Sequence, residues 1–193
     1  MLNALKRTAF AMIAAAAAFS LSSCAEADLT VMERIQNRLS ETESCWCAAT
    51  LTRISNKGEN TYETEQYNKT TGEYRMEITA PENMAGNYTV FDGEKIFQHN
   101  ARTGETFIRN YMNSEDVAVD TSVSLDESRC TVLEAVIPGG NRYTATEKMW
   151  IDNETLKPLK FVIYDADGNE RYIITYNEFE YDPEMDDSVF RAD

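Results

Sequence analysis

The sequence predicts a mainly β protein (α+β), with an antiparallel sheet of about ten strands and one N-terminal helix. Three observations lead to this fold class. Apolar residues recur at every second position over most of the chain. Turn residues separate these stretches at hairpin spacing, without a crossover helix between them. A helical period occurs near the N-terminus, where one apolar stripe must pack against something.

The clearest strands form a meander over residues 143–181, divided into 143–151, 159–164 and 169–181. Pro158 is excluded from a central strand position, so the chain must reverse before the middle strand. An Asp-Gly pair, Asp167-Gly168, gives the second reversal. In the middle strand, apolar residues alternate with more polar ones, which predicts one apolar face. The apolar set is Leu159, Phe161 and Ile163.

Seven further strands are expected along the chain, at 46–55, 61–70, 73–80, 87–91, 95–100, 105–111 and 130–137. The segment 113–129 interrupts them. Ser114 followed by two acidic residues resembles a helix cap, whereas the valines that follow alternate with polar residues. We expect a short helix or lid there. Near the C-terminus, Val189 and Phe190 are expected to enter the core.

The helical stretch covers residues 25–41, in which Met32, Ile35 and Leu39 fall on one face. Asp28 or Thr30 could cap its start.

Residues 1–23 have the features of a secretion signal: Lys6 and Arg7, then an alanine-rich apolar run that is short for a membrane span. The run ends in Leu-Ser-Ser-Cys, which resembles the bacterial lipobox. This resemblance implies cleavage before Cys24, attachment of a lipid to Cys24, and a domain over residues 24–193. The protein would be exported and anchored at the cell membrane, facing outward. The alternative is an ordinary signal peptide followed by a chance cysteine.

The formal charge of −15 becomes −17 without Lys6 and Arg7, because residues 1–23 contain no acidic side chain. Such a protein repels nucleic acid and anionic headgroups, so neither is expected as its partner. The acidic surface is either a solubilising feature or an acidic docking face.

Three cysteines remain after Cys24. Cys45 and Cys47 would point to the same side of a strand, and either could bond to Cys130 if the two strands are neighbours. A zinc site is not expected, because His99 is the single histidine and the chain has no Cys-x-x-Cys pair.

No catalytic residue or cofactor is expected. His99 is the only imidazole available as a base, and no Gly-x-Ser-x-Gly motif occurs. A solvated hairpin histidine explains it. The sequence Asp165-Ala166-Asp167-Gly168 has its glycine one ligand too early for an EF-hand loop, so it indicates a turn rather than a calcium site.

Several segments resemble the LolA-like superfamily of bacterial envelope proteins, with the germination lipoproteins of clostridia as the nearest branch. The matching residues are 72–77, 86–96, 150–152, 157–160, 167–168 and 176–179. The resemblance implies an open β half-barrel around an apolar cavity. It also implies a protein without enzymatic activity that acts through a protein partner, an amidase that modifies the spore cortex. The resemblance to this branch also allows a homodimer formed by exchange of strands, which the sequence alone does not decide.

A second function remains open, in which the cavity binds lipid or a lipoprotein. The residues expected to line such a cavity are Met76, Ile78, Met149, Ile151, Leu159, Phe161, Ile163 and Phe179. Ordinary core packing explains each of them equally well when they are taken singly.

Overall fold

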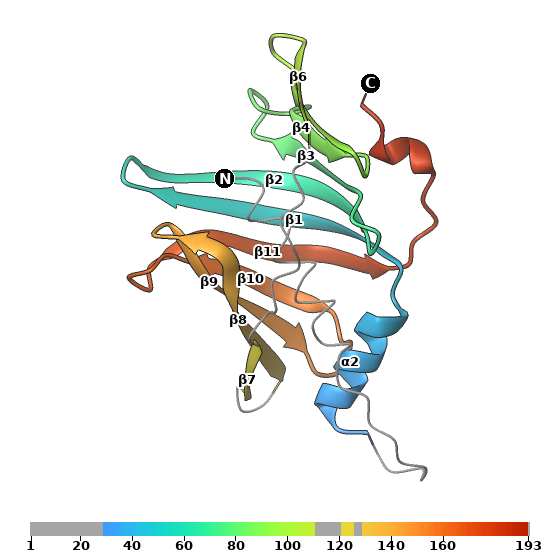
Figure 1. Cartoon of the computed structure of the whole chain (residues 1–193), viewed down its shortest axis with the longest axis vertical. Coiled ribbons are helices and arrows are strands. Elements are labelled where there is room, and N and C mark those ends of the chain that lie inside the picture. The colour runs from blue at the N-terminus through green and yellow to red at the C-terminus, as the bar shows by residue number, and fades with distance from the viewer. Residues whose placement is uncertain (1–28, 111–120, 126–128, 193) are drawn as a thin grey trace. The chain divides into compact units, whose positions relative to one another are not determined.

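The computed structural model describes residues 29–110, 121–125 and 129–192. Within these ranges it contains one α-helix, eleven strands and a short 3-10 helix near the C-terminus (Figure 1). In chain order the elements are α2 (Val31–Glu41), β1 (Ser44–Ser55), β2 (Gly58–Lys69), β3 (Tyr74–Ala80), β4 (Tyr88–Phe91), β5 (Lys95–Asn100), β6 (Glu105–Asn110), β7 (Thr121–Leu125), β8 (Cys130–Asn141), β9 (Thr144–Asp152), β10 (Pro158–Tyr164), β11 (Glu170–Tyr181) and η2 (Asp187–Phe190).

Hydrogen-bonded strands follow the order β6-β5-β4-β3-β2-β1-β11-β10-β9-β8-β7. The order has two ends, β6 and β7, so the sheet is open. Apart from β6 and β7, strands that follow one another in the chain are neighbours in this order, and β1 with β2 and β9 with β10 pair antiparallel. The mainly β, open antiparallel fold class is therefore confirmed.

Strand β7 corrects one expectation. It lies in the segment 113–129, where we expected a short helix or lid, and it pairs antiparallel with β8, with Thr121 opposite Ala135. In Thr121–Leu125 every second residue is polar, and this period of two suits a strand better than a helix. Residues 113–120 and 126–128 lie outside the described ranges.

The chain divides into two compact units. The first contains α2, β7 to β10 and residues 170–172 of β11. The second contains β1 to β6, the rest of β11 and η2. Each unit has its own buried face.

In the first unit, strands β8, β9 and β10 form an apolar row across the sheet. Leu133 lies opposite Met149, which lies opposite Phe161. Their side chains are 1%, 3% and 0% exposed, respectively. This row is the centre of the unit's core, and its regular register follows from the apolar alternation of the three strands.

Helix α2 begins at a capping box. The backbone N–H of Glu33 donates to Thr30 Oγ1 at 3.3 Å, and the backbone N–H of Thr30 donates to Glu33 Oε2 at 2.8 Å. Thr30 is therefore the cap, out of the two candidates that the sequence offered. The predicted stripe is buried at Ile35 and Leu39.

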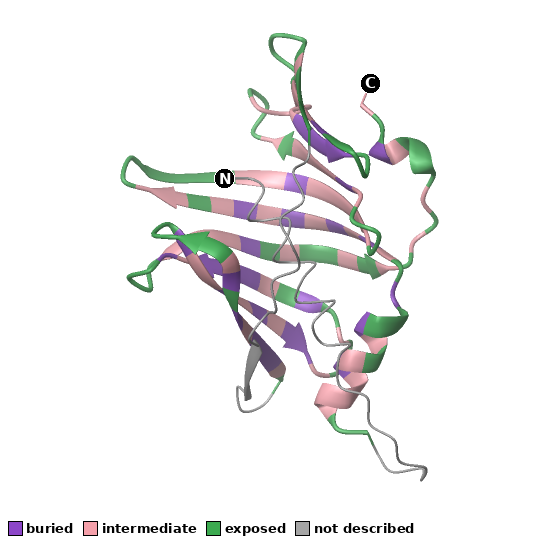
Figure 2. Ribbon diagram, in the orientation of Figure 1, coloured by how far each residue is buried: buried purple, intermediate pink, exposed green. Residues whose placement is uncertain are grey.

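In the second unit, β1 and β2 form a long hairpin with continuous register from Ser44 opposite Lys69 to Ser55 opposite Gly58. Over residues 44–51 of β1 every second residue is buried, visible as alternating bands in Figure 2; these residues are Cys45, Cys47, Ala49 and Leu51. Farther along the same sheet, Tyr74, Phe91 and Ile96 form a buried cluster.

The C-terminal segment packs on β2 and β3 of the second unit. Nη1 of Arg75 lies 3.5 Å from the carbonyl oxygens of Val189 and Arg191, and Lys69 Nζ lies 5.1 Å from the centre of the Phe190 ring. Phe190 is 4% exposed and Val189 is half-buried. The expected entry of this segment into the core is confirmed at Phe190.

Candidate functional site

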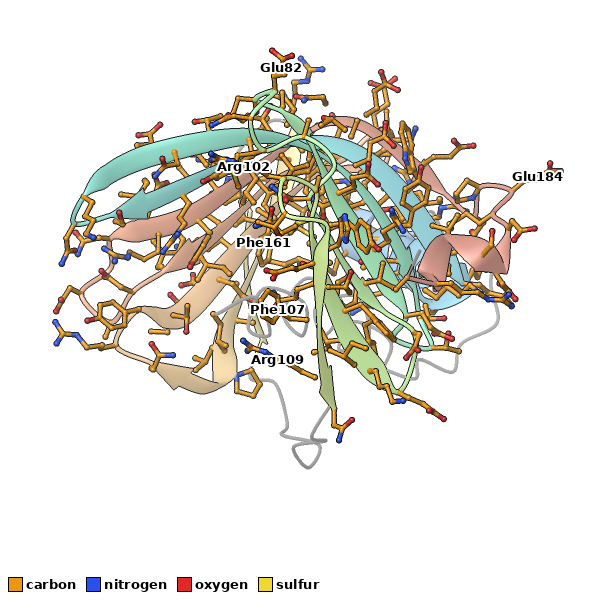
Figure 3. The ribbon with its side chains drawn as sticks, turned by 90° about the horizontal axis from the view of Figure 1, so that it is seen from above. Glu82, Arg102, Phe107, Arg109, Phe161 and Glu184 are labelled. Atoms are coloured by element: carbon orange, nitrogen blue, oxygen red, sulfur yellow. The ribbon has the colours of Figure 1, made fainter. Side chains whose placement is uncertain are left out.

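Strand β6 carries the most exposed large apolar side chains of the described residues. Phe107 and Ile108 are each 60% exposed. They are consecutive residues, so their side chains point to opposite faces of the strand. Phe107 and Arg109 lie along β6, with Arg102 in the turn that precedes it (Figure 3).

Strand β6 lies at one end of the strand order, so these side chains belong to an edge strand of the described sheet. On one side, β6 pairs with β5, where Phe107 lies opposite Gln98 and Ile108 opposite Phe97. On the other side, the described sheet has no neighbour for it. An edge strand offers unpaired N–H and C=O groups to another strand, and proteins blunt such edges with charges when no partner is intended. In β6 the charges are Glu105 and Arg109, and the apolar Phe107 and Ile108 lie between them.

The sequence predicted strand 105–111 and gave it no function. Its place at the sheet edge depends on the order of all the strands, which no local pattern encodes. One local signal was present. A strand with one wet face alternates apolar and polar residues, whereas Phe107 and Ile108 are adjacent between Thr106 and Arg109.

A row of side chains connects β6 to the interior of the second unit. Cζ of Arg75 lies 4.3 Å from the centre of the Tyr88 ring, and the Tyr88 ring stacks on His99 at 4.8 Å with 14° between the planes. His99 Nδ1 lies 2.9 Å from Thr106 Oγ1 on β6. We had expected His99 to be a solvated hairpin residue. That expectation is wrong, because the ring is half-buried and stacks on Tyr88. These contacts indicate a structural role in positioning the edge strand.

The predicted cavity residues are divided between the two units. In the first unit, four share one buried face of β9 and β10: Met149 at 3% exposed, Ile151 at 1%, and Phe161 and Ile163 at 0%. Leu159 does not join them and is 40% exposed. The sequence placed Leu159 on the apolar face because apolar and polar residues alternate along this strand. The pairing register with β9 shifts between Pro158 and Lys160, and this shift interrupts the alternation at Leu159.

In the second unit, the other three predicted cavity residues are half-buried. Met76 and Ile78 lie on one face of β3, opposite Gln66 and Thr64 of β2. Phe179 on β11 makes edge-to-face contacts with Tyr176 at 5.7 Å and with Tyr181 at 4.8 Å. Their role in lining a cavity stays a prediction.

Glu147 is a buried acidic residue that the sequence reasoning missed, on the same face of β9 as the predicted cavity residue Met149. It is 2% exposed and lies on the buried face of β9, opposite Ala135 on β8 and Ile163 on β10. The sequence could have predicted the burial of Glu147. It precedes Met149 by two positions, and residues two apart in a strand lie on the same face.

The three described cysteines are free thiols. Cys45 and Cys47 are buried on the same face of β1, as their spacing predicted. The possible disulfide between Cys130 and Cys45 or Cys47 is not formed, because all three thiols are free. It required neighbouring strands, and β1 and β8 are not neighbours in the strand order.

We expect Cys45 and Cys47 to resist iodoacetamide at about pH 8 while the chain is folded, because the thiolate is the reactive form. Burial raises the pKa of Cys45 to about 12 from a usual value of 9.0, and it also raises the pKa of Cys47. For Cys45 this lowers the thiolate fraction about a thousandfold. Mass spectrometry of alkylated peptides should therefore show Cys130 labelled first, and all three labelled in urea. Equal labelling in the folded chain would contradict this placement.

The segment Asp165–Gly168 forms a turn, as the sequence indicated. Asp165 Oδ1 accepts hydrogen bonds from the backbone N–H groups of Asp167 at 3.0 Å and Asn169 at 2.9 Å. The N–H of Asn169 is the main cause of the lowered pKa of this carboxyl. Gly168 adopts a φ of 82°, a backbone conformation that glycine tolerates best.

Cys24 and the proposed signal lie outside the described residues. In the described ranges, no helix combines the length and the apolar character needed to cross a membrane. Acidic, histidine and cysteine side chains of these ranges do not gather in threes that could hold a metal ion.

Comparisons with known proteins found one family model and several solved structures that are similar to this chain. A family model described as "Sporulation protein YdcC-like" matches residues 104–190. No curated protein matches the chain. An uncharacterized conserved protein from Thermus thermophilus has a similar structure, with a TM-score of 0.58 and 17% identity over 83% of this chain and 90% of that one.

Two other solved structures are similar over most of this chain. The structure of the CwlD amidase from Clostridioides difficile in complex with the GerS lipoprotein matches with a TM-score of 0.49 and 23% identity, covering 83% of this chain and 99% of that one. The LolA superfamily protein NE2245 from Nitrosomonas europaea matches with a TM-score of 0.47 and 11% identity, covering 86% and 99%. The similarity to the Thermus thermophilus protein shows that this fold occurs in a known structure.

Proposed function

We propose that this chain, with its LolA-like fold, is a non-enzymatic, lipid-anchored protein of the cell envelope that binds a protein partner along β6. The observation that carries the proposal is the exposure of Phe107 and Ile108, 60% each, on an edge strand. An incoming strand could pair with the backbone groups of β6 that have no strand partner among the described residues, and could bury one apolar side chain on each face. Arg109 and Glu105 at its two ends would help to select the register of that strand.

The setting that we propose is spore formation or germination, including modification of the cortex. The segment that matches the sporulation family model begins at residue 104, directly before β6, and thus includes the edge strand. The first partner to test is a cortex-modifying amidase from the same organism, the kind of partner that the resemblance to the germination lipoproteins implies.

The proposed anchor is a lipid on Cys24. Thr30, which caps helix α2, follows Cys24 by six residues. A fully extended segment of this length spans at most about 22 Å. The start of α2 would therefore be held close to the membrane surface, and two or three acyl chains would make the attachment stable.

A second candidate function is lipid or lipoprotein binding, which the apolar face of Met149, Ile151, Phe161 and Ile163 favours. These side chains are at most 3% exposed, so protein atoms already cover them, and a lipid would have to displace that cover. This burial favours the partner-binding function over the carrier function. Lipid retained by the purified chain in native mass spectrometry would favour the carrier function instead.

The test of the proposed function is a Phe107→Asp variant of the chain. We expect wild type to bind the amidase in biolayer interferometry and the variant to bind at least about 30-fold more weakly, as is typical for the loss of an interface hot spot of about 2 kcal/mol. An aspartate at this exposed position leaves the core intact, so far-UV circular dichroism should be unchanged.

The matched control is Leu159→Asp, which also replaces an exposed apolar strand residue, at 40% exposure, but lies on β10. It should bind the amidase like wild type. Equal binding by the Phe107→Asp variant would contradict β6 as the binding surface. The absence of binding by wild type would contradict the choice of an amidase as partner.

A further inference from the structure

A second exposed cluster, in the first unit, joins two arginines to one aromatic ring. Tyr143 follows the end of β8 and is 41% exposed. The Cζ atoms of Arg142 and Arg171 lie 5.0 Å and 5.6 Å from the centre of its ring. Both distances are within the range of cation–π contacts, so the ring holds both guanidinium groups.

The Cζ atoms of the two arginines are at most about 11 Å apart through the shared ring. Arg171 is partly balanced: its Nη1 lies 3.9 Å from Asp165 Oδ2. The other oxygen of Asp165 accepts backbone hydrogen bonds of the turn. Arg142 is exposed and pairs with no carboxylate in the described part of the chain. The cluster therefore has donor capacity for an additional anion.

We propose that Arg142, Tyr143 and Arg171 form a docking site for an acidic segment of a protein partner, with the guanidinium groups binding its carboxylates. Tyrosine and arginine are the residue types that dominate binding at protein interfaces. Guanidinium groups stacked on a ring keep their N–H edges available for bidentate bonds to carboxylates.

The exposed Tyr143 ring favours a peptide over a bare phosphate ion, because it offers apolar contact area that a phosphate does not use. The net charge of −15 disfavours a long polyanion such as nucleic acid, which the rest of the surface would repel. A short acidic segment can bind the positive cluster while contacting little of the acidic surface around it. The proposal goes beyond the function proposed above and does not depend on β6, because these residues lie in the other unit.

The test follows the side-chain Nε–H signals of arginine in the full chain, labelled with nitrogen-15, by NMR. The probe is an acetylated and amidated hexaglutamate peptide. We expect the Arg142 and Arg171 signals to shift to saturation, and the signal of the exposed Arg53 on β1 to stay in place. Arg142→Gln should lower the affinity for the peptide about tenfold or more, and Arg53→Gln should leave it unchanged.

Tyr143→Ala keeps both arginines but removes the ring that gathers them, and it should also weaken binding. An absence of shifts, or shifts of equal size at Arg53, would overturn the proposal. Inorganic phosphate is titrated in parallel. Saturation by phosphate at a lower concentration than by hexaglutamate would assign the cluster to phosphate and would overturn the choice of an acidic protein segment.

Discussion

Replacing Phe161 with alanine is expected to lower the free energy of unfolding by about 3–5 kcal/mol, the range for the loss of a buried phenylalanine. Phe161 is 0% exposed and lies opposite Met149 in the row that ends at Leu133. Removing the ring leaves a cavity that these strands cannot close without losing their register. Urea unfolding followed by circular dichroism measures the loss as a lower midpoint with an unchanged slope.

The matched control is Leu159→Ala on the same strand. Leu159 is 40% exposed after the register shift at Pro158 and Lys160, so its truncation should cost about 1 kcal/mol or less. Should Phe161→Ala prevent folding altogether, Phe161→Leu provides a milder variant with a smaller, measurable loss. Equal losses at positions 159 and 161 would mean that both side chains lie on the buried face, contrary to the structure.

This pair of residues also marks how far the sequence could predict the fold. Local signals predicted local features well. They gave two candidate caps for the helix, of which Thr30 is the cap, and they gave the turn at Asp165–Gly168 with the strands on either side of it. Each of these depends on residues within a few positions of one another. The exposure of Leu159 depends on an irregular pairing with β9, which the alternation of β10 alone does not reveal.

Features that depend on the strand order were not predictable from the sequence in the same way. The edge position of β6, and with it the importance of Phe107 and Ile108, follows only from the full order. The same order separates Cys130 from Cys45, which the sequence had left as a candidate disulfide. The candidate site was thus missed although its strand was correctly predicted, because the site is defined by which strand lacks a neighbour in the described sheet.

Asp152 organises the turn between β9 and β10, and its removal is the second large effect that we expect. Its Oδ1 atom accepts hydrogen bonds from the backbone N–H of Glu154 at 3.0 Å and from the N–H and hydroxyl of Thr155 at 2.7 Å and 2.9 Å. Leu156 then adopts a φ of 58°, which is unfavourable for leucine. Asp152→Ala leaves these donors unpaired and should cost about 1–3 kcal/mol.

The contribution of Asp152 should depend on pH. The backbone N–H of Thr155, followed by its hydroxyl, lowers the pKa of the Asp152 carboxyl below the usual 3.8. A lowered folded-state pKa gives stability that is fully present above the unfolded value and is lost as pH falls through the folded value. The difference in urea midpoint between wild type and Asp152→Ala should therefore shrink from about pH 7 to about pH 3. Asp152→Asn keeps the acceptor oxygen without the charge, so it should be less destabilising than alanine and should lack this acid-dependent loss. A constant difference between wild type and the alanine variant over that range would contradict a charged acceptor at the centre of this turn.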